Sequence, residues 1–465
     1  MKYISTRGII KKGEGKSFKQ VTLEGLARDG GLYIPYEFPK FSINKIDSMK
    51  NMNYAELTAE ILCEFTGEDL SKPEIFNIAS KAYKNFLVED AVKIRELGMN
   101  RFLLELFHGP TLAFKDFALQ LIGGIFDKFL HDDHRKKIIV AATSGDTGSA
   151  AIEAFKNKKN VKMFVLHPYG KISEFQRRQM TTVVAENIFN IAIKGNFDDC
   201  QALVKTLFKD EEFNKVFDLA SINSINWTRV LAQVVYYVYA TINIINSSNH
   251  TSVNFVVPTG NFGNAYAGYI AKKIGMPIDR LFIATNNNDI LSHFFQKGIY
   301  KISNVVPTLS PSMDIQVASN FERLLFEILE RDYTKVVKFM QSFSIESSLK
   351  INDQQLNNVQ ETFSSFSVSD KETLKIIKDV YDNTKITIDP HTAIGGKAFN
   401  FNIVEKNPLV LIATADPVKF REAVEKALGR RYKILKKYEV LFDLRENFII
   451  LDNQVSSLKN FIRVS

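Results

Sequence analysis

The sequence predicts an α/β fold built around parallel sheets. Several short runs are apolar throughout, and they are followed by polar or glycine-containing loops and then by segments with helical spacing. Continuously apolar strands that alternate with helices are typical of parallel sheets covered on both faces. Because ligands of such sheets bind at the carboxyl ends of the strands, we expect function in the loops that follow them.

Composition places the chain among ordinary globular proteins of two or three domains, with 465 residues, 45% of them hydrophobic and 24% charged. Lys and Arg number 60 against 52 Asp and Glu, and the net charge of +8 permits an anionic ligand, although lysines dispersed over the surface would give the same charge. The sequence has no basic stripe with interleaved aromatic residues, so we expect no nucleic-acid partner.

The N-terminus and the cysteines indicate a reducing compartment. The first residues lack a signal-like apolar segment and no apolar run is long enough to span a bilayer, so we expect a cytosolic location without membrane association. The two cysteines, Cys63 and Cys200, stand in unrelated contexts and predict neither a disulfide framework nor a metal site.

The N-terminal hundred residues are predicted to be mainly helical. Apolar residues at helical spacing run through 54–65, after a turn-rich segment at 27–35. Strands are predicted at 136–143, 161–168, 253–260, 281–285, 386–389 and 409–414. Helices are predicted over the alanine-rich segment 149–156 and from 264 to a stop at Gly275.

The segment ELFHGPTLAFKDF, residues 105–117, carries the most informative lysine. Lys115 stands among apolar residues, so it must reach water, pair with an acid or lose its charge. A desolvated lysine amine is a nucleophile that forms Schiff bases, most commonly with pyridoxal phosphate. A lysine on a helix surface, paired with Asp116, would give the same pattern, so other loops must complete a site.

Two strand-to-helix loops have the composition of ligand sites. Residues 256–264, VVPTGNFGN, contain Gly260 and Gly263 and open a helix, so backbone N–H groups can converge on a phosphate. Their spacing fits neither a P-loop nor a dinucleotide-binding fingerprint, and a turn without a ligand is equally compatible with them. Residues 142–149, ATSGDTGS, offer hydroxyl groups and Asp146, which suit a bound carboxylate or simple capping of the next helix.

Two further polar stretches are candidates for a second anion site. HPYGKIS at 167–173 offers Lys171, and SINSINWTR at 221–229 offers Asn226 and Arg229. Taken singly, such a stretch is more often a solvated loop or a satisfied core amide.

Taken in order, these motifs resemble the bacterial and fungal threonine synthase family. The motifs are ELFHGPTLAFKDF, TSGDTG, GKIS, NSINxxR, VPxGNFG and a late ATADPxKF, and the opening MKYISTRG and LARDGGLYIP are similar to that family's N-terminal domain. Six ordered motifs across residues 1–425 are far more specific than any one of them. The resemblance implies a pyridoxal-phosphate enzyme of fold type II, with two open α/β sheet domains, the cofactor between them, and a mainly helical N-terminal domain.

The resemblance also implies roles for individual residues. Lys115 should hold pyridoxal 5'-phosphate covalently and act as the catalytic base, and Thr414 should approach the pyridine nitrogen. The cradle for the cofactor phosphate should be Gly260, Asn261, Phe262, Gly263 and Asn264, although the family often has an acid at the last position. The expected substrate contacts are Ser144, Asp146 and Thr147 for the carboxylate or the cofactor's ring hydroxyl, and Lys171, Asn226 and Arg229 for the leaving phosphate.

The implied reaction converts O-phospho-L-homoserine and water into L-threonine and phosphate, the last step of threonine biosynthesis. One alternative is a phospho-lyase of the same family, which releases a 2-oxo acid, ammonia and phosphate; another is a catalytically silent scaffold protein. The expected assembly is a monomer or homodimer. The implied domains are 1–100 (N-terminal), 101–130 with 231–430 (larger, cofactor-binding), 131–230 (smaller, substrate-binding) and 431–465 (C-terminal extension).

Overall fold

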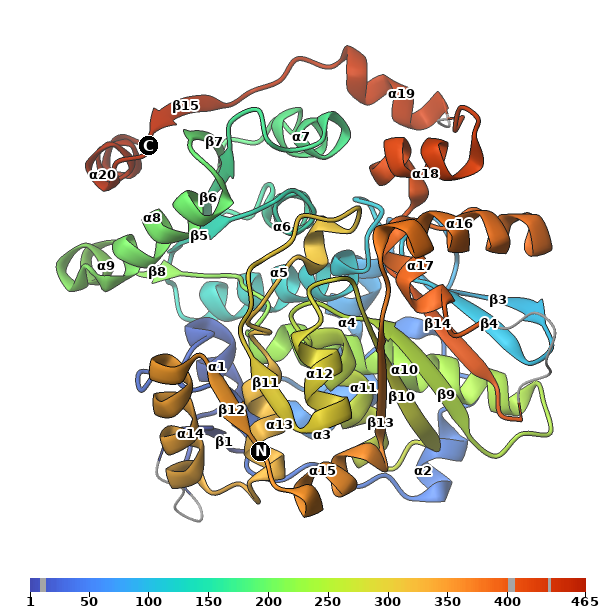
Figure 1. Cartoon of the computed structure of the whole chain (residues 1–465). Coiled ribbons are helices and arrows are strands. Elements are labelled where there is room, and N and C mark those ends of the chain that lie inside the picture. The colour runs from blue at the N-terminus through green and yellow to red at the C-terminus, as the bar shows by residue number, and fades with distance from the viewer. Residues whose placement is uncertain (9–13, 400–405, 434–435) are drawn as a thin grey trace.

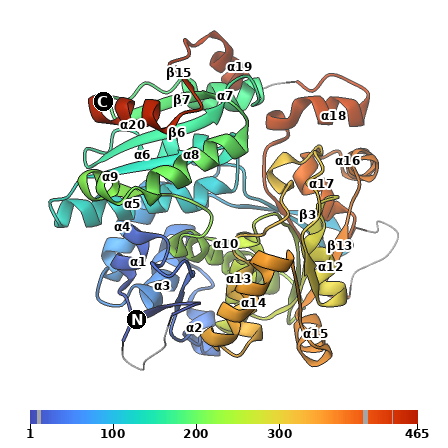
Figure 2. The same cartoon turned by 60° about the vertical axis from the view of Figure 1, so that its left-hand side comes forward.

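Two open sheets form the framework of the chain, whose computed structural model describes residues 1–8, 14–399, 406–433 and 436–465 (Figure 1). The larger sheet contains β3 (Lys93–Gly98), β4 (Arg101–Glu105), β9 (Val253–Pro258), β10 (Ile278–Thr285), β13 (Phe363–Ser367) and β14 (Leu409–Ala413). The smaller sheet contains β5 (Lys137–Ala142), β6 (Val161–Pro168), β7 (Ile188–Lys194), β8 (Leu219–Ala220) and β15 (Ile449–Asp452). Figure 2 shows the smaller sheet at the upper left and the larger sheet at the right.

Strand order and direction confirm the predicted α/β architecture. The larger sheet runs in the order β13-β10-β9-β14-β4-β3 and the smaller in the order β15-β7-β6-β5-β8. Every pairing is parallel except that of β3 with β4. The neighbours β4 and β14 are buried at every position, as expected for strands covered on both faces.

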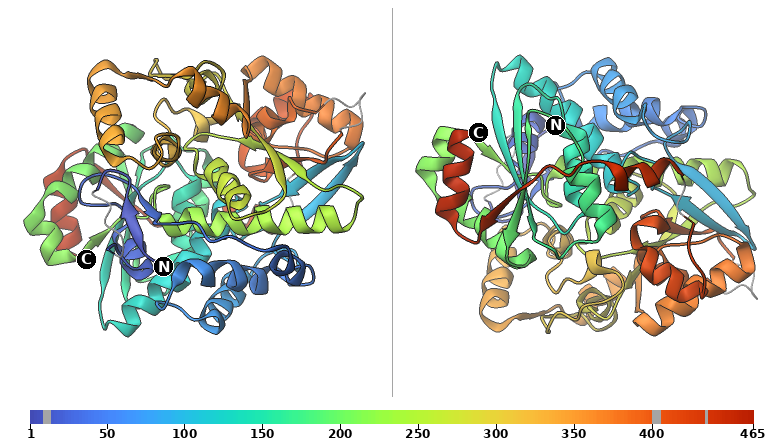
Figure 3. Two further views of the ribbon diagram at one scale, coloured as in Figure 1. Left: turned by 90° about the horizontal axis from the view of Figure 1, so that it is seen from below. Right: turned by 90° about the horizontal axis from the view of Figure 1, so that it is seen from above.

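Helices cover both sheets and connect them. Around the smaller sheet lie α6 (Asp146–Phe155), α7 (Glu174–Thr181), α8 (Phe197–Lys209), α9 (Glu211–Phe217), α19 (Lys436–Asp443) and α20 (Val455–Val464). Around the larger sheet lie α5 (Lys115–Asp132), α10 (Trp227–Asn246), α11 (Gly263–Lys273), α12 (Ile290–Lys297), α13 (Phe321–Ile328), α14 (Tyr333–Glu346), α15 (Asp353–Gln360), α16 (Asp370–Thr384), α17 (Pro390–Gly396) and α18 (Arg421–Leu428). The long helix α10 runs through the middle of the molecule, where it contacts α3, α5 and α11 (Figure 3). Smaller elements are the antiparallel pair β11 (Ile299–Lys301) and β12 (Ser348–Lys350) and the 3-10 helices η1 (Pro311–Met313) and η2 (Pro417–Phe420).

The N-terminal unit is mainly helical, as predicted. It contains α1 (Phe18–Glu24), α2 (Ile43–Ser48), α3 (Tyr54–Thr66) and α4 (Lys72–Tyr83), beside the antiparallel pair β1 (Tyr3–Ser5) and β2 (Tyr33–Pro35). Helix α3 confirms the helix predicted over 54–65. Asn53 accepts hydrogen bonds from the first-turn N–H groups, Glu56 bonds back to the Asn53 backbone, and Gly67 ends the helix with a φ of 60°.

Five of the six predicted strands are confirmed, and the one at 386–389 is wrong. That segment pairs with no strand in the described part of the chain. The Asp389 side chain instead accepts hydrogen bonds from the N–H groups of His391 and Thr392, and Pro390 is the first residue of α17. An aspartate cap followed by a proline is a strong local signal for a helix start, and here it overrides the apolar alternation of the segment.

The C-terminal segment joins the smaller sheet from outside. Strand β15 pairs in parallel with β7, and α19 packs on α7. Seen from above, this segment crosses over the smaller sheet (Figure 3). Strand β3 lies in the proposed domain 1–100 and pairs with β4 of the proposed larger domain, while β15 of the proposed C-terminal extension pairs with β7 of the smaller domain. Strand pairing therefore crosses two of the proposed domain boundaries, and the division into domains stays a prediction. No helix in the described part of the chain is long and apolar enough to cross a membrane.

Candidate active site

The loops singled out from the sequence all follow the carboxyl ends of strands. In the larger sheet they follow β4, β14 and β9, which are neighbours, and in the smaller sheet they follow β8, β5 and β6, which are also neighbours. Carboxyl ends of adjacent parallel strands share one edge of a sheet. Helices α5 and α6, which begin in two of these loops, lie against each other in Figure 1 and bring the two edges together.

Lys115 is the first residue of α5, and its side chain is only 13% exposed. Its Nζ lies 3.0 Å from Oδ2 of Asp146. Asp116 does not pair with it, because that carboxylate accepts hydrogen bonds from the backbone N–H and the hydroxyl of Thr111, at 2.9 and 2.6 Å. Burial lowers the pKa of Lys115, and the charge of Asp146 opposes this change. The amine is therefore buried and easier to deprotonate than an exposed lysine, as a nucleophile requires.

Asp146 is buried at the start of α6 and is surrounded by donors. Besides Lys115, its carboxylate lies 2.9 Å from Nζ of Lys419, 2.8 Å from Nε2 of Gln176 and 3.4 Å from the hydroxyl of Ser312. Burial alone would raise the pKa of Asp146, but the charges of Lys115 and Lys419 outweigh it and hold the pKa well below its ordinary value. Asp146 is thus an ionised carboxylate shared by two ammonium groups.

The rest of the loop before α6 presents hydroxyl groups. Thr143 Oγ1 accepts hydrogen bonds from the N–H groups of Gly145 and Gly148, at 3.0 and 2.8 Å. Thr143, and not Ser144, Asp146 or Thr147, therefore accepts hydrogen bonds from these N–H groups at the start of α6. Ser144 is exposed and Thr147 is half-buried beside Asp146, in positions open to a ligand.

The turn between β9 and α11 approaches its neighbours closely. Phe262 has a φ of 61°, in the left-handed region, immediately before α11 begins. A Cβ at Gly260 would lie 2.9 Å from the carbonyl oxygen of Ser312, so only glycine fits there. Asn261 is held by Ser319, which donates to its Oδ1 at 3.0 Å, and by Asn320, whose N–H donates to its carbonyl at 3.0 Å. The turn thus presents backbone at a helix N-terminus, the arrangement that binds phosphate.

Asn264 has an acceptor role in the structure. Its Oδ1 accepts hydrogen bonds from the hydroxyl groups of Tyr236 and Tyr237 on α10, at 2.7 and 2.8 Å. Its Nδ2 is buried and has no hydrogen-bond partner among the residues described. A carboxylate oxygen at this position could accept the same two hydrogen bonds. The turn therefore stays intact although this chain has Asn264 where the family often has an acid.

Thr414 lies just after β14, next to the Lys115 loop. Its carbonyl accepts the N–H of Phe114 at 2.9 Å, and its own N–H donates to the hydroxyl of Thr392 at 3.1 Å. Its side-chain hydroxyl is buried without a hydrogen-bond partner in the described residues. Buried hydroxyl groups are normally paired, so this one marks a place for a ligand atom.

Arg229 is a buried cation without a described counter-ion. It lies in the first turn of α10 and is 5% exposed, and its Nε and Nη1 find no hydrogen-bond partner within the described chain. Burial lowers the pKa of Arg229 to about 10. An unpaired buried guanidinium is expensive, and a bound phosphate would provide its missing partner.

The other two predicted phosphate contacts differ in their surroundings. Asn226 caps α10 through the N–H of Thr228, at 3.0 Å, and its Nδ2 donates to the carbonyl of Thr22 at 2.9 Å. This amide therefore fastens the helix that carries Arg229 to the N-terminal unit. Lys171 is exposed in the turn after β6, and no described contact joins it to Lys115.

Sequence reasoning missed the polar residues that surround Asp146. Lys419 stands in the late ATADPVKF motif, and Gln176 stands two residues before the end of the basic stretch EFQRR. His391, one residue after Pro390, accepts a hydrogen bond from the N–H of Ser312 at 3.3 Å and contacts Asp389 at 2.9 Å. The available signal for the last of these is the Asp-Pro-His sequence, in which Asp389 caps the helix that carries His391, whereas the predicted strand at 386–389 includes only its aspartate.

The residues fit pyridoxal phosphate. The fit rests on a buried amine, a close-packed glycine turn at a helix N-terminus, a buried hydroxyl without a partner and a buried arginine without an anion. These groups match the aldehyde, the phosphate and the polar ring atoms of this cofactor and the phosphate of a substrate. Among the described residues, no group of three or more His, Cys, Asp or Glu side chains has the arrangement of a metal site.

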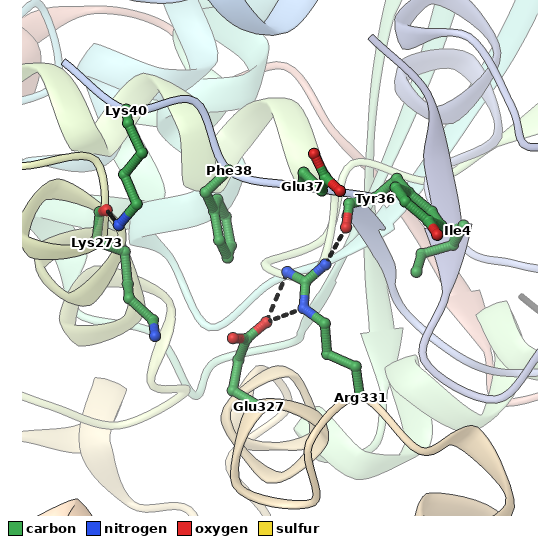
Figure 4. Close-up of a pocket in the computed structure, with 8 residues that line it drawn as sticks. All are labelled: Ile4, Tyr36, Glu37, Phe38, Lys40, Lys273, Glu327 and Arg331. Carbon is green, nitrogen blue, oxygen red and sulfur yellow. Dashed lines mark hydrogen bonds and ion pairs between the residues drawn. The ribbon is translucent and has the colours of Figure 1, made fainter. Parts of the chain in front are cut away.

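A pocket of about 490 Å³ lies elsewhere, between the N-terminal unit and α13. Figure 4 shows Arg331 in this pocket, bound to Glu327 and to the carbonyl of Tyr36. The lining residues are Ile4, Tyr36, Glu37, Phe38, Lys40, Lys273, Glu327 and Arg331. None of them belongs to the Lys115 site.

Family models match the chain along its length. "Threonine synthase N terminus" matches residues 2–83, "Pyridoxal-phosphate dependent enzyme" matches 88–346, and "Threonine synthase, C-terminal" matches 392–462. The threonine synthase of Pseudomonas aeruginosa is 43% identical over 464 residues, which cover 99% of this chain and 98% of that relative.

Solved structures give the same result. The PLP-bound threonine synthase from Brucella melitensis matches with a TM-score of 0.95 and 41% identity, over 100% of this chain and 99% of that one. Threonine synthase from yeast matches with a TM-score of 0.94 and 35% identity, over 99% of this chain and 98% of that one. Likeness of this extent covers the N-terminal unit, both sheets and the C-terminal segment together. The chain therefore belongs to the threonine synthase family of pyridoxal-phosphate-dependent enzymes of fold type II.

Proposed function

We propose that this chain converts O-phospho-L-homoserine and water into L-threonine and phosphate. The observation that carries the proposal is the buried amine of Lys115, which lies 3.0 Å from Asp146 and has a lowered pKa. Arg229 adds an anion site that a phosphorylated substrate would fill. A catalytically silent scaffold would have no use for either group.

The residues that would hold pyridoxal 5'-phosphate come from three loops of the larger sheet. Lys115 would be the covalent attachment point, the turn 260–264 would bind the phosphate through backbone N–H groups, and Thr414 would face the ring nitrogen. When bound, the cofactor supplies an electron sink that stabilises negative charge on the substrate carbon atoms. A hydroxyl partner for the ring nitrogen, unlike an acid, does not force that nitrogen to be protonated.

Lys115 would move the protons of the reaction. A general base works best when its pKa is near the working pH, and burial brings the pKa of Lys115 down toward that range. Its Nζ would accept the proton from Cα of the substrate and return protons in the later steps. Asp146 would hold this amine in place, because the two groups are already in contact in the folded chain.

We assign the predicted contact residues to the substrate carboxylate or to its phosphate according to their charge. The ionised carboxylate of Asp146 would repel the substrate carboxylate, so we assign that contact to the hydroxyl groups of Ser144 and Thr147. Arg229 would bind the phosphate, with Lys171 as a second, exposed cation, and Asn226 would act by fixing the start of α10.

The cellular setting is also part of the proposal. A cytosolic location suits a biosynthetic enzyme that has two free cysteines, Cys63 and Cys200. The partner is the small substrate, and the chain would act as a monomer or homodimer without nucleic acid.

The test follows three quantities in one sample of the purified chain with pyridoxal phosphate and O-phosphohomoserine. They are the visible absorbance of the bound cofactor, free phosphate and the amino-acid or 2-oxo-acid product. We expect threonine and phosphate in equal amounts. Phosphate with 2-oxobutyrate and ammonia would instead establish the phospho-lyase, and absence of phosphate release from cofactor-loaded protein would refute both reactions.

A further inference from the structure

Lys419 places a second ammonium group beside the active-site carboxylate. The residue lies in η2, directly after the Thr414 loop, and its side chain is 0% exposed. Its Nζ lies 2.8 Å from the carbonyl oxygen of Thr111, 3.1 Å from Oε1 of Gln179 and 2.9 Å from Oδ1 of Asp146. A lysine this deeply buried needs a reason, because taking an ammonium out of water carries a large penalty.

The two ammonium groups approach different oxygens of one carboxylate. Lys115 lies against Oδ2 of Asp146 and Lys419 lies against Oδ1, so the carboxylate is held from both sides. Gln176 adds a neutral hydrogen bond to Oδ1. Rotation of the carboxylate would break at least one ion pair, which fixes its orientation toward Lys115.

The charges around Lys115 come from several elements. Asp146 on α6 favours its protonated form, whereas Lys419 in η2 and Arg229 on α10 disfavour it. His391 on α17 helps to lower the pKa of Asp146, and the Asp116 carboxylate accepts hydrogen bonds from Thr111. Without Lys419, the negative charge of Asp146 would act on Lys115 alone and would hold the proton on its amine more tightly.

We propose that Lys419 is a positioning residue of the reaction: as the buried ion-pair partner of Asp146, it keeps that carboxylate ionised and fixed, and it eases loss of the proton from Lys115. Lys419 acts through Asp146 and not by contact with the substrate. It also ties the two sheets together, because Asp146 follows β5 of the smaller sheet while Lys419 and Lys115 follow β14 and β4 of the larger one.

This inference rests on the proposed function for its role in turnover, but its test does not require turnover. The full chain, before addition of pyridoxal phosphate, is acetylated with trace acetic anhydride across a range of pH, and the peptide that contains Lys115 is quantified by mass spectrometry. The rate follows the fraction of free amine. In Lys419→Met we expect the midpoint of the Lys115 profile at higher pH and acetylation several-fold slower at neutral pH.

Further variants separate charge from structure. Lys419→Arg keeps the positive charge and should restore the parent profile, whereas Lys419→Gln removes the charge but can still donate to the Thr111 carbonyl, and it replaces the Met variant if that one fails to fold. Lys128→Met changes a half-exposed lysine on the same helix α5 and should leave the Lys115 profile unchanged.

The outcomes are distinguishable from failure of the proposed function. A midpoint that is unchanged, or that moves to lower pH, in folded Lys419→Met or Lys419→Gln would overturn the role of Lys419. Product analysis of the same parent preparation, after pyridoxal phosphate and O-phosphohomoserine are added, judges the reaction itself. A shifted profile with no threonine formed would therefore support the charge arrangement and reject the reaction.

Discussion

The ammonium of Lys115 and the carboxylate of Asp146 lie 3.0 Å apart, although 30 residues and a change of sheet separate them in the chain. Lys115 opens α5 after β4 of the larger sheet, and Asp146 opens α6 after β5 of the smaller one. The environment of the reactive amine therefore depends on how the two sheets sit against each other. Any motion that separates them removes the carboxylate from the amine.

Replacement of Lys115 should remove both covalent cofactor attachment and turnover. In Lys115→Ala we expect no visible absorbance characteristic of the attached cofactor and a loss of activity of about 1000-fold or more, because the nucleophile and the base are the same group. Absorbance and product formation measure the two effects. Lys128→Ala, on the same helix but half-exposed, is the matched control and should keep both. Full activity in Lys115→Ala would refute the assignment.

Replacement of Asp146 by asparagine should change the protonation of Lys115. The carboxylate raises the pKa of Lys115 against the effect of burial, so Asp146→Asn should lower this pKa further. The pH profile of Lys115 acetylation measures the change, with a midpoint expected at lower pH than in the parent. We also expect turnover to fall by about 100-fold, because the amine loses its positioning partner. A midpoint that moves upward would contradict the ion pair.

Arg229 should matter for substrate binding and not for stability. Arg229→Met removes a buried cation that has no described partner, so the free energy of unfolding without ligands should stay constant or rise. The KM for O-phosphohomoserine should rise by about 10- to 100-fold, since a hydrogen bond to a charged group is worth about 1.5–3 kcal/mol. Urea unfolding and steady-state kinetics measure the two quantities.

Arg323 is the matched control for this prediction. It is also fully buried, but it donates to the carbonyl groups of Tyr33 and Ile225, at 2.9 and 2.6 Å. Arg323→Met leaves these acceptors unpaired and should lower the free energy of unfolding by about 3 kcal/mol. If Arg229→Met unfolds as easily as Arg323→Met while its KM stays unchanged, Arg229 is structural.

The hydroxyl of Thr414 should stabilise the cofactor-bound protein and should not stabilise the ligand-free chain. Thr414→Val removes a buried hydroxyl that pairs with no described residue, so the ligand-free chain should keep its Tm. The increase in Tm on addition of pyridoxal phosphate should be smaller in Thr414→Val than in the parent, because one polar contact to the ring is lost. Thr414→Ser keeps the hydroxyl and should retain the increase. Equal thermal shifts in all three proteins would place the ring nitrogen elsewhere.

The C-terminal segment should contribute stability in a pH-dependent way. Glu446 receives two hydrogen bonds from Arg177 and one from Thr181, and the Arg177 contact is the main reason that the pKa of Glu446 is lowered to about 2. A carboxyl group with a lowered folded-state pKa adds stability above its unfolded value of 4.5 and loses it as the pH falls toward 2.

Glu446→Gln tests this contribution. At neutral pH we expect the free energy of unfolding to fall by about 2 kcal/mol, the scale of a charged hydrogen-bonded pair. The difference between the variant and the parent should narrow steadily below pH 4.5, where the parent carboxylate becomes protonated in the unfolded chain. Denaturant unfolding at several pH values measures it. A difference that does not depend on pH would show that packing, and not charge, is responsible.

Much of the fold and the reactive lysine could be predicted because their signals are local. Lys115 stands out as a charge inside an apolar segment, and the turn at 260–264 has glycines between a strand and a helix. The strand at 386–389 was wrong because two local signals conflicted, and the aspartate cap before Pro390 was the stronger. Strand β13, FSSFS, lies at the edge of its sheet and has too little apolar character to be recognised.

The surroundings of Asp146 could not be predicted, since they depend on contacts between distant segments. Lys419 binds residues 111, 146 and 179, and nothing within ATADPVKF indicates those partners. Similarly, a charged loop residue such as Asp146 suggests a ligand contact when viewed alone. Only its position between two lysines shows that its charge is already paired within the protein.

Strand β15 is synthesised long after the other strands of the sheet that it joins. Residues 449–452 form an edge strand of the smaller sheet, beside β7, while the other strands of that sheet lie between residues 137 and 220. A ribosome that makes the chain from the N-terminus exposes β7 long before β15 exists, so the β7 edge has no strand to pair with during that time. Nascent chains that stall before residue 449 would thus present the β7 edge to other chains, and residues 449–452 cover that edge once they are made.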